Sequence, residues 1–168
     1  GKLLLGTYRH LGASFLKGVK DVLPSIVIIM IAFGITYIAA EGNILHPIFR
    51  YFYNAVSGIS PYLAVLLLYV FILIIEFFIP SASAKAVLII PMLTLAPIEG
   101  ISTTVIILTY LFADGYTNVL YPTCGTLLVG LGLADVSFAE WFKKTILFQL
   151  FLMALSIGFL MLAVFIGL

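Results

Sequence analysis

Three ionisable side chains, Glu76, Lys85 and Asp114, stand in stretches of sequence that are otherwise almost entirely apolar. An ionised side chain that faces lipid at the centre of a bilayer costs about 2.5–3.5 kcal/mol on insertion scales, so each should face the protein interior. Lys85 could pair with either carboxylate or meet a carboxylate of a bound solute. The alternative is a buried ion pair with a purely structural role, which we favour for Glu76 and leave open for Lys85.

Two polar interruptions contain or adjoin these charges. The first runs from Pro80 to Lys85 and the second from Asp114 to Gly125, and both are rich in Ser, Thr, Asn, Gly and Pro. Backbone that leaves a helix inside a bilayer must find hydrogen-bond partners in protein or in a polar cavity. Free carbonyls and hydroxyls suit a cation such as Na⁺, and the helix N-terminus after each break favours an anion. Two such breaks near the midplane indicate a transporter site, the alternative being ordinary surface loops.

The composition places these features in a membrane. Of 168 residues, 64% are hydrophobic and 9% charged, with a mean hydropathy of +1.28, whereas soluble domains carry about 25% charged residues. The net charge of +1 does not indicate a nucleic-acid partner. Cys124 is the single cysteine, so no intramolecular disulfide is expected. Neither His10 nor His46 lies in a predicted span and Asp114 has no partner aspartate there, so we predict that the protein is not an enzyme.

The apolar pattern predicts an all-α integral membrane protein built from five segments. The run Ala86–Ala96 is bracketed by Pro91 and Pro97, and its roughly eleven residues cover only about half of a 30 Å hydrocarbon core. It therefore predicts the returning arm of a re-entrant hairpin. The segments are an interfacial amphipathic helix (1–20), a transmembrane helix with an interfacial connection (21–61), the re-entrant hairpin (62–97), a broken transmembrane helix (98–134), and an interfacial helix with a closing transmembrane helix (135–168).

The basic residues predict the orientation of these segments. With the N-terminus of the chain cytoplasmic, six basic residues lie inside and Arg50 alone lies outside, as the positive-inside rule expects for an inner-membrane protein. A re-entrant hairpin and a pair of complete crossings leave the same basic residues on each side of the membrane. The shortness of Ala86–Ala96 therefore decides in favour of the hairpin. The six are Lys2, Arg9, Lys17, Lys20, Lys143 and Lys144.

The two interruptions also carry a resemblance. FFIPSASAKAVLIIPM (Phe77–Met92) and LFADGYTNVLYPTCGTLLVGLGL (Leu111–Leu133) resemble the paired motifs of the ion transporter superfamily, and in particular its YfcC-like branch. That branch is related to C4-dicarboxylate and short-chain fatty acid carriers, and the p-aminobenzoyl-glutamate transporters share a similar hairpin tip. GVKDVLPSIVIIMIAFGI (Gly18–Ile35) resembles the opening of the second half of YfcC-like proteins. The similarity runs from about Phe15 to the C-terminus.

The resemblance implies one inverted-repeat half of an elevator-type secondary active transporter. The expected activity is cation-coupled symport or exchange of a small organic solute, a carboxylate or an amino acid. The expected partners are the lipid bilayer, a missing N-terminal half or a second membrane chain, and a second copy of the complete carrier in a homodimer. No cofactor is expected, with Na⁺ as the candidate coupling ion. The alternative is a non-transporting structural or channel-forming membrane subunit.

The resemblance also implies which residues bind. The hairpin tip would contribute Ser81, Ser83 and Lys85, and the broken helix would contribute Asp114, Gly115, Thr117, Asn118, Pro122 and Thr123. Na⁺ would be held by Ser81, Ser83, Thr117 and Asn118. Phe33 stands where many YfcC-like proteins have Arg, and Ala84 and Lys85 stand where many have Gly or Gln. The resemblance therefore does not predict the substrate.

Overall fold

The computed structural model describes residues 11–79, 81–95 and 98–168, and every regular element in these ranges is a helix. Among them, three are long and apolar enough to cross a membrane by length and composition: Gly12–Glu41, Pro61–Phe78 and Phe138–Phe165. The predicted all-α membrane class is thus confirmed. The helices are α2 (Leu11–Glu41), α3 (Leu45–Val56), α4 (Pro61–Phe78), α5 (Ala82–Leu95), α6 (Thr103–Thr117), α7 (Gly125–Leu133) and α8 (Phe138–Phe165).

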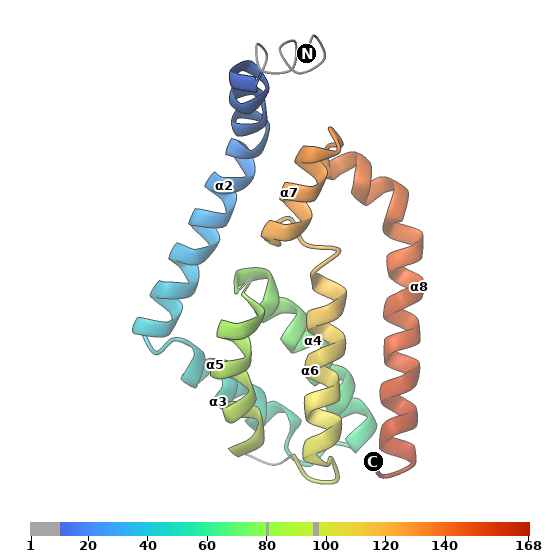
Figure 1. Cartoon of the computed structure of the whole chain (residues 1–168). Coiled ribbons are helices and arrows are strands. Elements are labelled where there is room, and N and C mark those ends of the chain that lie inside the picture. Colours follow the sequence, from blue (N-terminus) through green and yellow to red (C-terminus); the bar gives the residue numbers. More distant parts are fainter. Residues whose placement is uncertain (1–10, 80, 96–97) are drawn as a thin grey trace, which may run out of the picture.

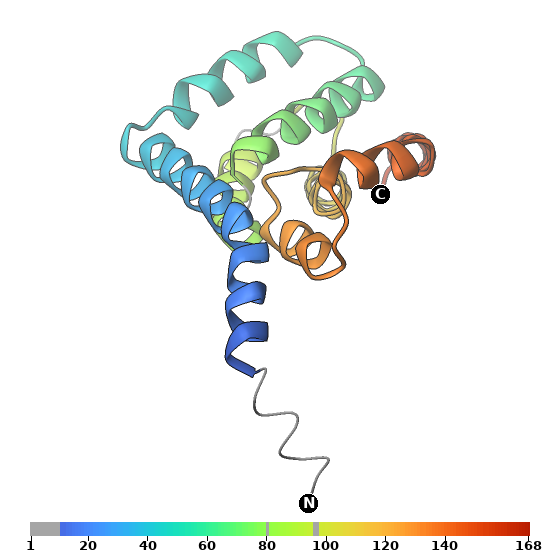
Figure 2. The ribbon, with the colours of Figure 1, turned by 90° about the horizontal axis from the view of Figure 1, so that it is seen from above.

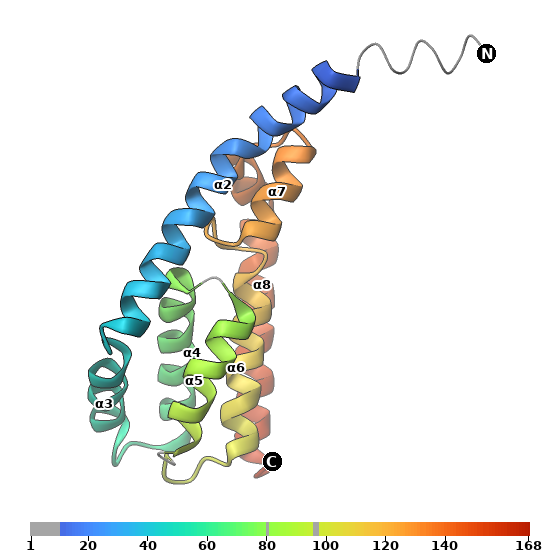
Figure 3. The same cartoon turned by 60° about the vertical axis from the view of Figure 1, so that its left-hand side comes forward.

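Helix α2 is continuous across the boundary that the sequence predicted at residue 20. Pro24 lies well inside this helix. A proline removes one backbone hydrogen bond and bends a helix without necessarily ending it. Figure 3 shows α2 as one curved rod along the outside of the molecule. The first ten residues of the predicted interfacial helix lie outside the described ranges.

Helix α8 likewise joins two segments that were predicted separately. It begins after Ser137, whose hydroxyl accepts a hydrogen bond from the backbone N–H of Glu140 at 3.2 Å. Its first turns run across one end of the molecule, and the helix then turns to run the full height of the fold (Figure 1). The predicted interfacial helix and closing span are therefore two arms of one bent helix.

The core is built around α6. Seen from above, α6 lies at the centre with α4, α5 and α8 around it, and all three contact it (Figure 2). Leu68 and Ile72 of α4, Ile106 and Ala113 of α6, and Leu160 of α8 are almost wholly buried there. Within a bilayer such packing stabilises the fold through van der Waals contacts, because lipid tails are as apolar as these side chains. The core thus fixes the broken helix against both arms of the hairpin.

Helix α2 packs mainly against α7, where glycines allow a close approach. A Cβ at Gly125 would lie 2.8 Å from Cδ1 of Ile29, and one at Gly132 would lie 3.4 Å from the backbone oxygen of Asp21. The close approach at Gly125 places Ile29 of α2 beside the first residue of α7. It brings the middle of α2 next to the break between α6 and α7.

The starts of α2 and α8 lie at one end of the molecule, whereas α3 and the C-terminus lie at the other (Figure 1). Lys17 and Lys20 belong to the start of α2, Lys143 and Lys144 to the start of α8, and Arg50 to α3. The basic residues of α2, α3 and α8 therefore divide between the two ends of the molecule, whereas Lys2 and Arg9 lie outside the described residues and the cytoplasmic side stays a prediction.

Helices α4 and α5 form a hairpin whose tip lies at the level of the break between α6 and α7 (Figures 1 and 3). The hydroxyl of Thr36 in α2 lies 3.2 Å from the carbonyl oxygen of Phe78, at the end of α4, and donates to it. The 14 residues of α5 span about 21 Å, less than the 30 Å hydrocarbon core of a bilayer. The tip of the hairpin therefore lies between the two ends of the molecule and not at either end (Figures 1 and 3).

Candidate functional site

The helix break lies at residues 118–124, later than the sequence predicted. Asp114 to Thr117 were expected to be non-helical, yet they form the last turn of α6. The carbonyl oxygen of Thr117 accepts from the backbone N–H groups of Leu120 at 3.1 Å and Tyr121 at 3.0 Å, which turns the chain. Pro122 then disfavours helix at the preceding residue, so the helix cannot resume before Gly125.

Tyr121 anchors this break to the hairpin. Its hydroxyl donates to the backbone oxygen of Leu73 in α4 at 2.9 Å, and its ring meets Phe77 edge to face at a centroid distance of 5.5 Å. The contact holds the non-helical segment against the outgoing arm of the hairpin.

Tyr121→Phe should keep the ring contact and lose the hydrogen bond. We expect the free energy of unfolding to fall by about 0.5–1.5 kcal/mol, the usual net worth of one such bond. Chemical unfolding of the detergent-solubilised carrier would measure it. An unchanged unfolding midpoint would show that the hydroxyl does not hold the segment.

The three ionisable groups singled out in the sequence meet behind the break. The Nζ atom of Lys85 lies 2.6 Å from Oδ1 of Asp114 and 3.4 Å from Oε2 of Glu76. The side chains of Lys85 and Glu76 are 1% and 0% exposed and that of Asp114 is 18% exposed. Each group therefore faces the protein interior, as the cost of charge in lipid required.

Hydrogen bonds extend this ion cluster along the broken helix. The hydroxyl of Thr117 donates to Oε2 of Glu76 and also lies 3.1 Å from the backbone oxygen of Asp114. The side-chain nitrogen of Asn118 lies 3.5 Å from Oδ2 of Asp114. The side-chain oxygen of Asn118 accepts a weak hydrogen bond from the thiol of Cys124 at 3.8 Å. Asp114 thus connects the buried lysine to the first residue of the break.

A cavity of about 620 Å³ with a partly polar lining lies beside the ion cluster, between the hairpin tip, the break and α2. Ser81 enters it from the tip, immediately before α5, and Cys124, Gly125 and Thr126 enter it from the start of α7. Two helix N-termini therefore open onto one cavity, where their N–H groups and positive partial charge favour an anion. The complete lining is Ile29, Phe33, Ser81, Asn118, Val119, Thr123, Cys124, Gly125 and Thr126.

A small void of about 10 Å³ lies between this cavity and the ion cluster. Asn118, Thr123 and Cys124 line both spaces, and Glu76, Lys85, Thr117 and Tyr121 complete the void. Oε1 of Glu76 and the hydroxyl of Thr123 have no hydrogen-bond partner in the described part of the chain. A void of this size holds about one water molecule, which would satisfy both groups.

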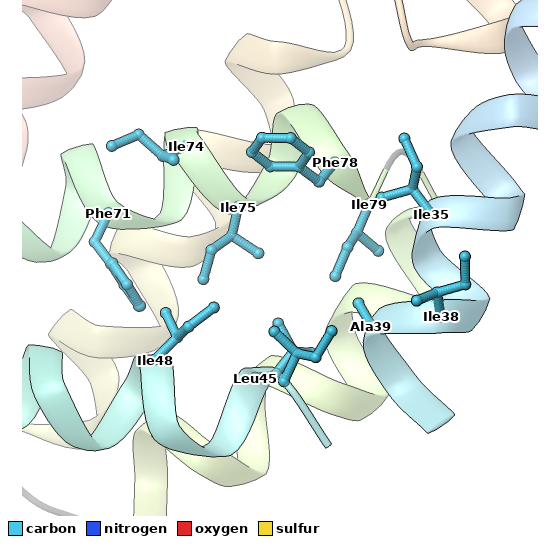
Figure 4. Close-up of a pocket in the computed structure, with 11 residues that line it drawn as sticks. Ile35, Ile38, Ala39, Leu45, Ile48, Phe71, Ile74, Ile75, Phe78 and Ile79 are labelled. Atoms are coloured by element: carbon cyan, nitrogen blue, oxygen red, sulfur yellow. The ribbon is translucent and has the colours of Figure 1, made fainter. Parts of the chain in front are cut away.

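A second hollow has the opposite character. Figure 4 shows a groove of about 350 Å³ between α2, α3 and α4, and every side chain drawn around it is apolar. Its three walls include Ile38 of α2, Ile48 of α3 and Phe71 of α4. A groove without a polar group cannot orient a polar solute, whereas the 620 Å³ cavity can.

The predicted site residues fall into three groups in the structure. Ser81, Asn118 and Thr123 line the cavity, while Lys85, Asp114 and Thr117 lie behind it. Gly115 lies on an exposed part of α6 and Pro122 is half-buried, and neither lines the cavity. The side chain of Ser83 lies outside the described residues. In the described ranges, no three His, Cys, Asp or Glu side chains gather as metal ligands.

Sequence reasoning did not assign Ile29 and Thr126 to the site. Thr126 directly follows the predicted interruption and could have been found by extending that motif by one residue. Ile29 is an ordinary apolar residue of a long apolar helix, and only the packing of α2 on α7 brings it to the cavity.

Comparisons with known proteins agree with the resemblance seen in the motifs. A family described as C4-dicarboxylate anaerobic carrier, DcuC, matches residues 6–165. The chain is 30% identical over 156 residues to YfcC of Escherichia coli (strain K12), whose name gives it a proposed role as a basic amino acid antiporter. It is also 30% identical over 131 residues to an uncharacterized protein of Haemophilus influenzae. No solved structure matches it.

These alignments cover most of this chain and a minor part of its relatives. They include 88% of the chain and 31% of YfcC, and 77% of the chain and 26% of the Haemophilus influenzae protein. The chain therefore spans about a third or less of the length of the relatives it matches. With the family match running over nearly its whole length, the chain belongs to the C4-dicarboxylate anaerobic carrier (DcuC) family of membrane transporters.

Proposed function

We propose that this chain forms part of a secondary active transporter for a small organic solute that bears a carboxylate, such as a dicarboxylate, a short fatty acid or an amino acid. The observation that carries the proposal is the 620 Å³ polar cavity, onto which Ser81 from the hairpin tip and Asn118 and Thr123 from the broken helix converge. Discontinuous helices around a polar cavity are the usual pointer to a transporter site.

The start of α7 supports the choice of a carboxylate. Its N-cap residue, Cys124, makes no side-chain capping bond, so the first N–H groups of the helix stay available to a ligand. The N-terminus of α5 begins directly after Ser81 at the same cavity. An amino acid would use the same contacts for its carboxylate and direct its cationic end towards Asp114 or Glu76.

The complete carrier would supply the rest of the site. We propose a second inverted repeat, on the same or another chain, and a homodimer in the inner membrane with the N-terminus of this chain cytoplasmic. The α4–α5 hairpin would be re-entrant, and its movement with the broken helix would be of the elevator type. Na⁺ coupling through Ser81, Ser83, Thr117 and Asn118 stays a prediction, with solute exchange as the other mode.

Ligand binding can be tested by thermal unfolding of the natural full-length carrier. The panel would hold dicarboxylates, short-chain fatty acids, basic amino acids and small peptides, each in sodium and in choline buffer. A compound at 100 times its Kd should stabilise the native state by about 2.7 kcal/mol, because it binds only that state. We expect one carboxylate class to raise the midpoint.

Asn118→Ala is the matching variant, because Asn118 lines the cavity and bonds to Asp114. It should remove the response to the active compound and leave the ligand-free midpoint nearly unchanged. If no compound shifts wild-type protein, the carboxylate proposal fails, and the structural or channel-forming subunit becomes the better description.

A further inference from the structure

Two carboxylates from different helices converge on one point between the hairpin and the broken helix. Glu76 comes from α4 and Asp114 from α6, and Thr117 adds a hydroxyl beside them. Negative oxygens gathered beside a helix break are what a coupling cation would bind in a carrier. Here the point is already filled by a cation that is covalently part of the chain, the ammonium of Lys85.

The ammonium of Lys85 occupies the point between the two carboxylates. Its Nζ atom lies 2.6 Å from Asp114 and 3.4 Å from Glu76, and its side chain is 1% exposed. An ion that approached either carboxylate would lie beside the ammonium and be repelled strongly, because the surroundings are apolar. A free cation could therefore bind there only by displacing the lysine.

Lys85 belongs to α5, so its ammonium is part of the hairpin that moves in the proposed transport cycle. Its backbone N–H bonds to the carbonyl oxygen of Ser81 at 2.9 Å, in the first turn of α5, so the ammonium travels with the hairpin tip. Its partner Asp114 orients Asn118 through the other carboxylate oxygen, and Asn118 lines the cavity. Lys85 is thus a positioning residue that acts on the cavity through Asp114 and Asn118.

We propose that the Lys85 ammonium is a tethered cation that replaces a coupling ion at Glu76 and Asp114, so that the carrier closes on its solute without Na⁺ at this point. The transport part of this inference rests on the proposed function. A cation bound to the chain crosses with the hairpin in both directions, so it cannot draw energy from an ion gradient. Solute would then move down its own gradient or in exchange for solute on the opposite side.

The first test needs no substrate. Lys85→Ala keeps Cβ and removes a chain that ends in an ammonium, so propylammonium fits the space left behind. Its addition should raise the unfolding midpoint of Lys85→Ala by several degrees, whereas 1-propanol, which has the same length without the charge, should not. Wild-type protein and Lys144→Ala, which loses an exposed pair with Glu140, should not respond to propylammonium.

If propylammonium fails to stabilise Lys85→Ala beyond the effect of 1-propanol, no cation is needed at this point and the proposal is overturned. Should Lys85→Ala be too unstable to purify, Lys85→Met tests the same point with the packing kept. Its midpoint should stay well below that of wild type, and an equal midpoint would overturn the proposal.

The second test uses the compound identified by the panel. Wild-type carrier should bind it equally in sodium and in choline, and an imposed Na⁺ gradient should not drive its accumulation in proteoliposomes. Lys85→Ala should bind it about 10- to 100-fold more weakly, the cost of losing a charge-assisted contact, with propylammonium restoring most of the affinity. Binding by wild type that requires Na⁺ would overturn the tethered cation and leave the carrier function intact.

Discussion

Asp114→Ala should lower the free energy of unfolding by about 3–5 kcal/mol, because it removes one partner of a buried ion pair and leaves the other charge uncompensated. Lys85 would keep only Glu76, at 3.4 Å, and its own side chain would stay 1% exposed. Chemical unfolding of the full-length carrier in detergent would measure the loss. Glu140→Ala is the control, since it removes a lysine partner at a similar distance of 2.7 Å from an exposed surface and should change stability little.

A paired substitution separates the charge from the space it fills. Asp114→Leu combined with Lys85→Met replaces both charges by apolar side chains of the same branching or similar length. Such replacements are often neutral or stabilising, so the double variant should recover most of the stability that Asp114→Ala loses. It should still fail to bind the solute, since Asn118 would lose the carboxylate that orients it. A loss in the double variant as large as in Asp114→Ala would show that the ionic contact is not the cause.

The sequence predicted both interruptions because proline marks each of them. The first interruption falls between α4 and α5, and Pro122 lies in the break that ends where α7 begins at Gly125. It also predicted that Glu76, Lys85 and Asp114 face inwards, because each would be costly in lipid. The sequence left open whether Lys85 pairs with Glu76, with Asp114 or with a carboxylate of the solute, and the structure places it beside both side chains.

What the sequence could not predict depends on packing between distant helices. Asp114–Thr117 contains a glycine and two short polar side chains, which suggested a loop, yet contacts of α6 with α4 and α5 keep this turn helical. The sequence also carries no local sign that Ile29 lines the cavity, because its position depends on the close approach of α2 to α7 at Gly125. The sequence around residue 20 is basic and apolar, and it does not show whether the predicted interfacial helix and the predicted span are separate. In the structure they form the single helix α2.

Asn118→Leu should reduce uptake by about 100-fold or more while the protein stays folded. Leucine has the same branching and the same number of heavy side-chain atoms as asparagine, but it cannot bond to Asp114 or to a polar solute. When a buried site loses one hydrogen-bonding side chain, the polar group of the ligand that it contacted is left without a partner, and the affinity falls strongly. Initial uptake into proteoliposomes at equal protein, with the unfolding midpoint measured alongside, tests this.

Val119→Leu is the matched control, because Val119 is the next residue, lines the same cavity and is already apolar. It enlarges a side chain at that wall without removing a hydrogen bond, so uptake should change by about twofold at most. Equal uptake by Asn118→Leu and wild type would mean that the solute does not bind in this cavity. A selective loss in Asn118→Leu would place recognition at the break itself, where the ion cluster meets the cavity, and not in the helices that surround it.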